Sequence, residues 1–392
     1  RWAPFGSVGV GWNIHNETWV KDHWAFVDRL KIRASLGWVG SQSFNPFQAI
    51  AKYEYDVNNR YRYGIGATMK GLANHDLKWQ KTTQRNIGID FDLLKRRLMV
   101  TANYYVNTSK SLLSDITLAP SLGFSTYTEN IGELENRGFD LKIRGTLFRT
   151  KDAYLNLAVG VSHNANKLKK ISNGLRAWNE VQDDSLTNVP RVRFIEGESL
   201  NTIWGVPSVG INPANGKEVF IDRNGLRTDK WNAKDQRPIG YEDPDVEGNI
   251  SLTGGYKGFS LSVYMTYRLG GETYNQTLVD RVENADKRYN CDRRVLKDRW
   301  KKAGDITFFK DIANNETTQA TSRFVETYHY LTMSSLSLSY DWEAHWLKQM
   351  RVRNLRLSFY MNDVFRWSSV KQERGLDYPF ARSFRTSLRI TF

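Results

Sequence analysis

The feature that most constrains this chain is a strict alternation of apolar and polar side chains, which recurs eleven times along its 392 residues. Successive side chains of a β-strand point to opposite faces, so a two-residue period predicts a strand with one apolar and one polar face. In the C-terminal segment Phe384, Leu388, Ile390 and Phe392 share one face, whereas Arg385 and its alternate neighbours share the other. The sequence therefore predicts an all-β fold of eleven strands.

The other ten alternating segments resemble the C-terminal one, and their polar faces are strongly charged. Their apolar faces begin at Val8, Leu30, Ile87, Leu98, Phe139, Leu155, Ile250, Phe259, Leu336 and Leu355. Their opposite faces carry Lys31, Arg33, Asp90, Asp92, Lys142, Arg144, Arg268, Arg356 and Arg389. A tightly packed interior could not hold so many charges without a large desolvation cost. This face therefore needs water or a polar filling.

The connections between the segments alternate in length. Residues 41–75, 112–131, 171–247 and 271–320 form long connections, whereas residues 93–97 and 257–258 form short ones. Outer-membrane barrels have short periplasmic turns and long extracellular loops. A two-layer sandwich, which would bury the apolar faces, remains the alternative, but it gives no reason to separate loops by length. We therefore expect a transmembrane antiparallel β-barrel with extracellular long loops and a periplasmic C-terminus.

The predicted number of strands, eleven, is odd, which bears on whether these residues form a complete barrel. Single-chain bacterial barrels normally have an even number of strands. An open sheet in lipid would also leave backbone donors and acceptors unpaired along two edges. We therefore expect residues 1–392 to be the C-terminal part of one barrel domain, with the first strands absent.

Composition excludes several other classes of protein. No stretch approaches the roughly 18 apolar residues that a membrane-spanning helix needs. The formal charge of +14 is scattered over many segments instead of forming a basic arm, so we expect no nucleic-acid partner. Cys291 is the only cysteine, which excludes a disulfide framework.

The sequence shows no pattern that predicts catalysis. Its six histidines are dispersed, and no pair has the spacing of a helical metal site. Asp243, Asp245 and Glu247 could supply oxygen ligands to Ca²⁺, but Pro244 between them favours an ordinary turn. We therefore expect no enzyme activity, no cofactor and no metal site.

Aromatic residues in the long loops are the candidates for contact with a substrate or partner: Trp178, Trp204, Trp231, Tyr241 and Trp300. Aromatic rings can stack on sugars or on peptide side chains. Alternatively, they form the cores of folded loops. Turn residues at 212–216 and 222–225 flank residues 217–221, which are predicted to form a short strand between two turns and therefore indicate a folded loop.

Several motifs carry a family resemblance. They are LKWQKTTQ at 77–84, NIGELENRGFDL at 130–141, EGESL at 196–200, RVLKDRW at 294–300, TSRFVE at 321–326, and YP at 378–379 before the last strand. Together they resemble the SusC/RagA family of TonB-dependent outer-membrane proteins of Bacteroidetes.

The resemblance implies a 22-stranded barrel with a plug inside, of which these residues would supply about the last eleven strands. The plug and the TonB box would then lie outside this chain. The implied activity is TonB-dependent import of glycan or peptide nutrients across the outer membrane of a Gram-negative cell. The implied partners are a SusD-like surface lipoprotein, the TonB complex through the absent N-terminal part, and outer-membrane lipid or lipopolysaccharide. The alternatives are a non-transport barrel for adhesion or secretion and a soluble β-rich carbohydrate-binding protein.

Overall fold

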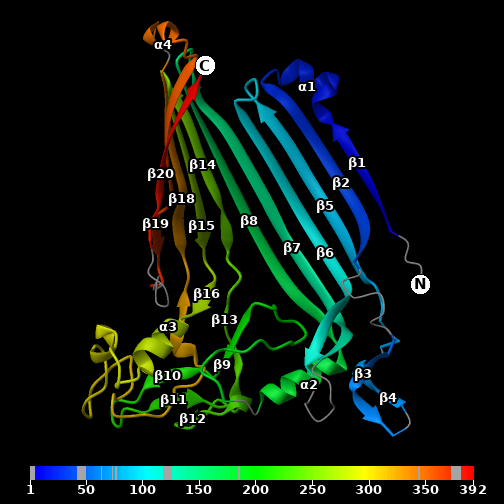
Figure 1. The fold of residues 1–392 in the computed structure, drawn as a ribbon, viewed down its shortest axis with the longest axis vertical. Coiled ribbons are helices and arrows are strands. Elements are labelled where there is room, and N and C mark those ends of the chain that lie inside the picture. Colours follow the sequence, from blue (N-terminus) through cyan, green and yellow to red (C-terminus); the bar gives the residue numbers. More distant parts are fainter. Residues whose placement is uncertain are drawn as a thin grey trace.

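One antiparallel sheet of eleven strands dominates the computed structural model, which describes residues 5–41, 50–62, 64–72, 74–75, 77–117, 126–183, 186–342, 345–371 and 381–392 (Figure 1). Its strands, in spatial order, are β1 (Gly6–Asn13), β2 (Val27–Ser41), β5 (Gln80–Leu93), β6 (Leu98–Thr117), β7 (Thr126–Arg149), β8 (Ala153–Ile171), β14 (Val246–Tyr256), β15 (Phe259–Leu269), β18 (Tyr330–Trp342), β19 (Asn354–Ser368) and β20 (Phe384–Thr391). The prediction of eleven strands is confirmed.

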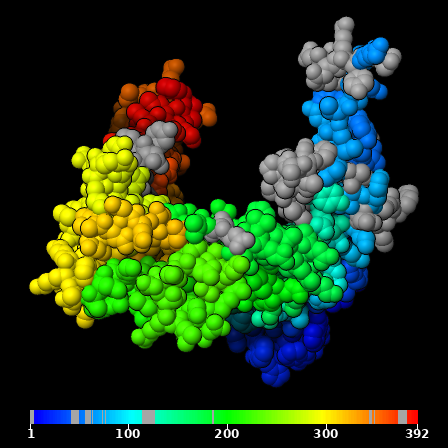
Figure 2. Space-filling model, turned by 90° about the horizontal axis from the view of Figure 1, so that it is seen from below, coloured from blue at the N-terminus to red at the C-terminus, as the bar shows by residue number. Residues whose placement is uncertain are grey.

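The sheet is an up-and-down meander that curves without closing. Each strand pairs with the sheet strand that precedes it in the sequence, so β1 and β20 form the two edges. Seen along the strands, the molecule curves around an open side between the N-terminal and C-terminal strands (Figure 2).

The strand register joins the apolar faces into one surface. Leu157, Leu252, Val263, Leu336 and Met361 form one row of paired residues across β8, β14, β15, β18 and β19. Another row crosses β1 to β8 through Trp12, Ile32, Ile89, Ala102, Leu141 and Val161. Side chains on this surface stay open to the surroundings, as Trp12 (54% exposed) and Ile32 (41%) show. Among the described residues no second sheet covers this face, so the chain does not form a sandwich.

The opposite face holds the charges, and several of them pair across strands. Asp90 on β5 lies 3.2 Å from Arg29 and 3.6 Å from Arg33, both on β2. Asp341 on β18 accepts hydrogen bonds of 2.7 Å from Nε and Nη2 of Arg356 on β19. These pairs are partly exposed, as expected for a face in contact with water or polar groups.

Short and long connections lie at opposite ends of the sheet (Figure 1). One end has the turns 94–97 and 257–258, η1 (Ile14–Asn16) with α1 (Thr18–His23), and α4 (His345–Gln349). Around α1, Ile14 and Val20 pack on Leu30 and close this turn with a small apolar core. The long connections gather at the other end, as the sequence predicts. No helix in the described part of the chain is long and apolar enough to cross a bilayer.

One predicted boundary is wrong. The sequence predicts a connection at residues 112–131, but β6 continues to Thr117, β7 begins at Thr126, and residues 112–117 pair with residues 126–132. The register shifts around Leu112, where Ser111 has a φ of 55°. This bulge moves one residue out of the alternation, so the two-residue period ends before the strand does.

Exposed aromatic residues mark the short-turn end of the sheet. Trp12, Trp19 and Trp24 are 42–54% exposed, and the rings of Trp19 and Trp24 pack edge to face at 6.0 Å. At the same end of the sheet, on β15 and β18, the rings of Phe259 and Tyr340 pack at 4.3 Å, and Tyr340 also packs on Trp342. Belts of amphipathic rings are typical of the interfaces between membrane and water.

We predict that the two faces of β15 respond differently to a charge. Val263 lies on the apolar face, and the neighbouring Ser262 lies exposed on the polar face. An arginine on a lipid-facing position near the bilayer midplane costs about 2–4 kcal/mol. Val263→Arg in the full-length protein should therefore lower the amount of assembled barrel in outer membranes, and Ser262→Arg should not. Equal amounts of both variants would contradict a lipid-facing Val263.

A second prediction concerns the close approach of β7 and β8. A Cβ atom on Gly138 would lie 2.1 Å from the backbone oxygen of His163, whereas one on Gly145 in the same strand would meet nothing closer than 3.9 Å. Overpacking of this kind costs about 1–3 kcal/mol. Gly138→Ala should therefore lower the melting temperature of the purified full-length barrel, measured by its heat-dependent mobility in gels. Gly145→Ala serves as the control, and an equal loss in both would refute the close-packing argument.

Candidate functional site

The two longest connections fold together into one body, called here the loop lobe, which comprises residues 172–245 and 270–329. Its secondary structure consists of α2 (Asn173–Gln182), β9 (Thr202–Gly205), β10 (Ser208–Ile211), β11 (Glu218–Ile221), β12 (Arg227–Thr228), η3 (Ala233–Asp235), β13 (Arg237–Tyr241), β16 (Glu272–Tyr274), α3 (Gln276–Leu278), η4 (Val279–Glu283), η5 (Arg293–Leu296), η6 (Ser322–Phe324) and β17 (Val325–Thr327). The hairpin of β3 (Lys52–Tyr61) and β4 (Gly64–Gly71) lies apart from it (Figure 1).

Backbone hydrogen bonds join the two connections of the lobe. Val206 N donates to Ala320 O, and Ser322 N donates to Val206 O, each at 3.1 Å. The predicted hairpin is present as β10 and β11, closed by a turn in which Gly216 N donates to Asn212 O at 2.8 Å. The long connections are therefore folded, as the sequence predicts.

The lobe has its own apolar core. Val279, Val282, Val295, Phe309 and Phe324 are all buried and pack together, with Tyr274, Leu278, Phe308 and Ile312 around them. The rings of Phe308 and Phe324 meet edge to face at 5.7 Å. Burying such side chains stabilises a fold by about 1.5–3 kcal/mol each. The second connection of the lobe, residues 270–329, therefore has an apolar core of its own.

A buried arginine ties the lobe together next to this core. Arg323 binds Glu218 through Nε at 3.1 Å and through Nη2 at 2.7 Å, and its Nη2 also donates to Glu283 Oε1 at 2.6 Å. The side chains of Arg323 and Glu218 are 4% and 8% exposed, and that of Glu283 is fully buried. One cation therefore holds β11, from the first connection, against η4 and η6 of the second.

Two further cations surround the same carboxylates. Lys310 Nζ donates to Asn284 Oδ1 at 3.1 Å and to Thr318 Oγ1 at 3.0 Å, and it also contacts the Glu316 carbonyl. Arg299 donates to the carbonyl oxygens of Lys310 and Glu283, each at 3.1 Å. Both side chains are buried, so their hydrogen bonds to oxygen atoms replace the water that they lose.

The cations respond differently to this burial. Burial by itself lowers the pKa of Arg323, but the adjacent Glu218 and Glu283 outweigh it, and the net pKa is raised. For Lys310 burial is the largest effect, and its pKa is lowered. Burial lowers the pKa of Arg299 in the same way. The positive charge is therefore well compensated at Arg323 and costly at Lys310 and Arg299.

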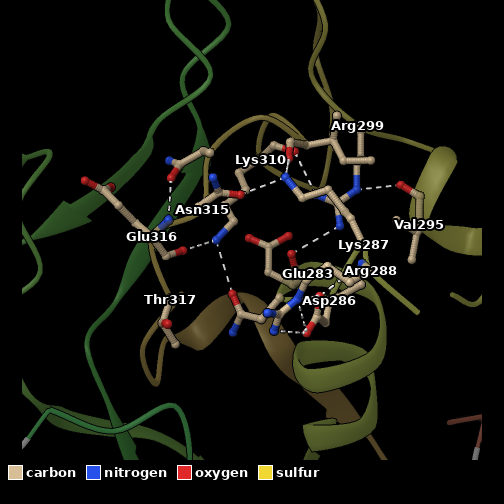
Figure 3. A pocket seen from close by; sticks show the side chains of 14 residues that line it. Glu283, Asp286, Lys287, Arg288, Val295, Arg299, Lys310, Asn315, Glu316 and Thr317 are labelled. Carbon is tan, nitrogen blue, oxygen red and sulfur yellow. Dashed lines mark hydrogen bonds and ion pairs between the residues drawn. The ribbon is translucent and has the colours of Figure 1, made fainter. Parts of the chain in front are cut away.

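A polar cavity of about 510 Å³ opens beside this network (Figure 3). Glu283, Arg299 and Lys310 form its floor, and Asn284, Ile312 and Asn314 line its walls. Its rim holds Asp286, Lys287, Arg288, Asn315, Glu316 and Thr317. On this rim Arg288 binds Asp286 through two nitrogens, and these hydrogen bonds lower the pKa of the Asp286 carboxyl to about 2.

The predicted aromatic residues lie elsewhere in the lobe. Trp204 is 4% exposed in β9, Trp231 donates through Nε1 to Ala320 O at 3.1 Å, and Trp300 donates to Pro213 O at 2.9 Å. Trp178 lies half-buried on α2, and Tyr241 is 46% exposed with its hydroxyl 3.2 Å from Glu198 Oε2. None of the five lines the cavity. Trp204 is therefore packed inside the lobe, whereas Trp231 and Trp300 are half-buried and held by hydrogen bonds within it.

The turn that offered possible calcium ligands has a structural explanation. The Asp243 carboxylate accepts hydrogen bonds from Ser199 Oγ at 2.7 Å, from Asn201 Nδ2 at 2.6 Å, and from Asn166 Nδ2 on β8 at 3.1 Å. These bonds fasten the lobe to the end of the sheet. No group of three or more potential metal ligands occurs among the described residues.

The sequence reasoning missed the buried charges, although a signal for them was present. Arg299 lies in the motif at 294–300, and Arg323 lies in the motif at 321–326. In the sequence these two motifs indicated only the family resemblance. Arg299 directly precedes Trp300 and Arg323 directly precedes Phe324. An arginine next to a large aromatic residue that is due to be buried can itself be buried, and it then needs an anionic partner.

We predict that Arg323 stabilises the lobe more than any exposed arginine does. Arg323→Leu would leave two carboxylates buried without their partner, which costs about 3–5 kcal/mol. Hydrogen exchange of residues 276–324 in the detergent-purified full-length protein should therefore accelerate strongly. The control is Arg293→Leu, since Arg293 is exposed in the same lobe. Unchanged exchange in Arg323→Leu would show that the network contributes nothing to stability.

Comparison with known proteins agrees with this architecture. A TonB-dependent receptor of Formosa agariphila is 26% identical over 94% of this chain and 39% of its own length. The TonB-dependent receptor SusC of Bacteroides thetaiotaomicron is 30% identical over 72% of this chain and 29% of its own length. This chain thus spans less than half of the relatives that it matches.

Solved structures show the same fold. The RagAB peptide importer in the closed-closed state superposes with a TM-score of 0.81 and 21% identity, over 99% of this chain and 43% of that chain. The model of the TonB-dependent receptor-like β-barrel family matches residues 1–364. The chain therefore belongs to the TonB-dependent receptor β-barrel family of the outer membrane, and its likeness to SusC and to the RagAB structures confirms the SusC/RagA resemblance.

Proposed function

We propose that the whole protein is a TonB-dependent importer of glycan or peptide nutrients, in which these residues form part of the barrel wall and its loop lobe. The observation that carries this proposal is the eleven-stranded sheet, whose apolar face is continuous while its opposite face is charged. The apolar face fits lipid. The charged face fits a watery lumen that is large enough to hold a plug.

The width of the sheet supports a large barrel. Eleven strands leave the sheet open on one side, so the closed barrel needs many more strands than the eight whose interior side chains alone can fill (Figure 2). A lumen of that size conducts solutes unless a plug closes it. Energy-coupled import uses such a plug, and we place it, together with the TonB box, in the part of the protein that precedes these residues.

We place the loop lobe outside the cell and the short turns in the periplasm. Outer-membrane barrels have this asymmetry of loop length. In this arrangement a SusD-like lipoprotein docks on the lobe as a lid, and the exposed Tyr241, with Trp178 on α2, is available to a substrate or to that partner. The RagAB complexes are peptide importers, which supports a peptide substrate, and glycans are the second class that the family resemblance implies.

Uptake by intact cells tests this function. Deleting the gene should abolish growth on one class of nutrient, glycan or peptide, and the full-length gene should restore it. Dissipating the proton gradient should stop uptake of the labelled nutrient in the wild type, because TonB coupling consumes that gradient. A strain that grows normally on both classes but no longer adheres to surfaces would favour an adhesion barrel. Recovery of the protein without detergent would exclude a membrane protein altogether.

A further inference from the structure

The outward face of the sheet, which carries the apolar rows, changes character toward the long connections. On β5, β6 and β7 its last row of apolar and aromatic side chains consists of Ile87, Tyr104 and Phe139, all exposed. The next outward row along the same strands contains Arg85 and Arg137. Two residues of an antiparallel strand rise by about 7 Å, so a cationic row directly follows an aromatic one.

Four cations of this region have no anionic partner within the part of the chain that the structure describes. Lys81 and Arg85 lie on β5, Arg137 lies on β7, and Lys167 lies on β8. All four side chains are exposed, and the strand register turns all four to the outward face. They are called here the cationic patch.

The two carboxylates on this stretch of β7 are already paired with other lysines. Glu133 lies 3.6 Å from Lys110 Nζ, and Glu135 lies 3.2 Å from Lys169 Nζ. These pairs leave the cationic patch without compensation from the strands that carry it. Its charge is therefore available to an anion from outside the chain.

No comparable patch exists on β14, β15 and β18, whose outward positions the structure describes throughout. None of these positions holds a charged residue. At the end toward the loop lobe they present Tyr267 and Leu331, in one row with Trp367 on β19. The cationic patch is therefore a local feature of β5, β7 and β8.

The geometry of the patch suits a phosphate group at the surface of a membrane. Arg85 and Arg137 flank Val106, their common neighbour on β6. Their strands lie two spacings apart, roughly 10 Å, so both guanidinium groups reach a phosphate above Val106. Guanidinium groups bind phosphate through paired, charge-assisted hydrogen bonds. Trp38, 37% exposed on β2, lies one row further toward the long connections, and tryptophan is typical of the headgroup level of a membrane.

We propose that the cationic patch binds the phosphate groups of lipopolysaccharide in the outer leaflet of the membrane. In lipopolysaccharide these groups lie where the acyl chains meet the sugar headgroup, and cations directly beyond an apolar band lie at that level. Clusters of lysine and arginine at a membrane surface attract anionic lipid headgroups. The inference rests on the proposed function, because it requires the long connections to lie outside the cell.

Binding of lipopolysaccharide to the detergent-purified full-length protein tests the patch. Microscale thermophoresis compares two probes, intact lipopolysaccharide and the same lipid after hydrofluoric acid has removed its phosphate groups. The intact lipid should bind at least about tenfold more tightly, because the cations of the patch lose their anionic partner in the other probe. Equal binding of the two probes would show that acyl chains alone drive binding and would overturn the proposal.

Inorganic phosphate distinguishes a lipid site from a site for a free anion. At a concentration equal to that of the lipid it should not displace lipopolysaccharide, since the acyl chains of the lipid also contact the apolar rows. Displacement would assign the patch to a free anion and overturn the lipid.

A matched pair of variants locates the site. Arg85→Gln with Arg137→Gln should weaken binding of the intact lipid by at least about tenfold, because two charge-assisted contacts are lost. Arg149→Gln with Lys151→Gln removes the same charge from exposed positions at the short turn between β7 and β8 and should leave binding unchanged. Equal binding by the two double variants, or a loss in the second alone, would place the lipid elsewhere.

Uptake assays separate this inference from the function on which it rests. A protein that imports its nutrient normally but binds both probes equally would refute the patch alone. A protein that prefers intact lipopolysaccharide but shows no uptake dependent on the proton gradient would refute energy-coupled import and leave the patch standing.

Discussion

The structure depends on a register that keeps apolar side chains on one face of every strand. Backbone groups in a membrane must be paired within the sheet, and a register slip of one residue would turn each apolar row toward the polar face. The rows through Ile89 and Leu252 cross ten strands, and the pairing of Met361 with Phe384 carries the same register to the eleventh, β20. Glycine at positions such as 138 lets neighbouring backbones approach without disturbing it.

Polar anchors then fix the connections to the end of the sheet. Asn130 donates to the carbonyl oxygens of Lys78 and Ser111, and Lys78 N donates back to Asn130 Oδ1 at 2.8 Å. Asn166 on β8 similarly binds both Ser199 and Asp243 of one long connection, and Ser199 also donates to Asp243. Asn130, Lys78 and Ser199 all belong to motifs that carry the family resemblance. These three motifs therefore include residues that attach loops to the sheet.

Polar side chains also fix the arrangement of the chain inside the loop lobe. Its core is small, and Arg323 joins elements that lie 105 residues apart in the sequence, as the bond to Glu218 shows. A buried ion pair adds little net stability, but it penalises every arrangement in which a partner is missing. The network thus makes two long connections one body with a defined surface, which is what a docking or binding role requires. The receptor family to which the chain belongs fits a protein that is not an enzyme.

The sequence by itself determined the strands, their two faces and the alternation of connection lengths, because a two-residue period is a local property of each segment. The prediction was wrong where this period is interrupted: the bulge at Ser111 breaks the alternation, so β6 was predicted to end too early. The sequence also indicated the aromatic residues of the loops but could not decide their surroundings: Trp204 is buried, and hydrogen bonds hold the half-buried Trp231 and Trp300 within the lobe. Only the tertiary structure brought Glu218, Glu283 and Arg323 together beside the cavity. Contacts between residues so far apart are set by how the connections fold over one another, and no short pattern encodes that.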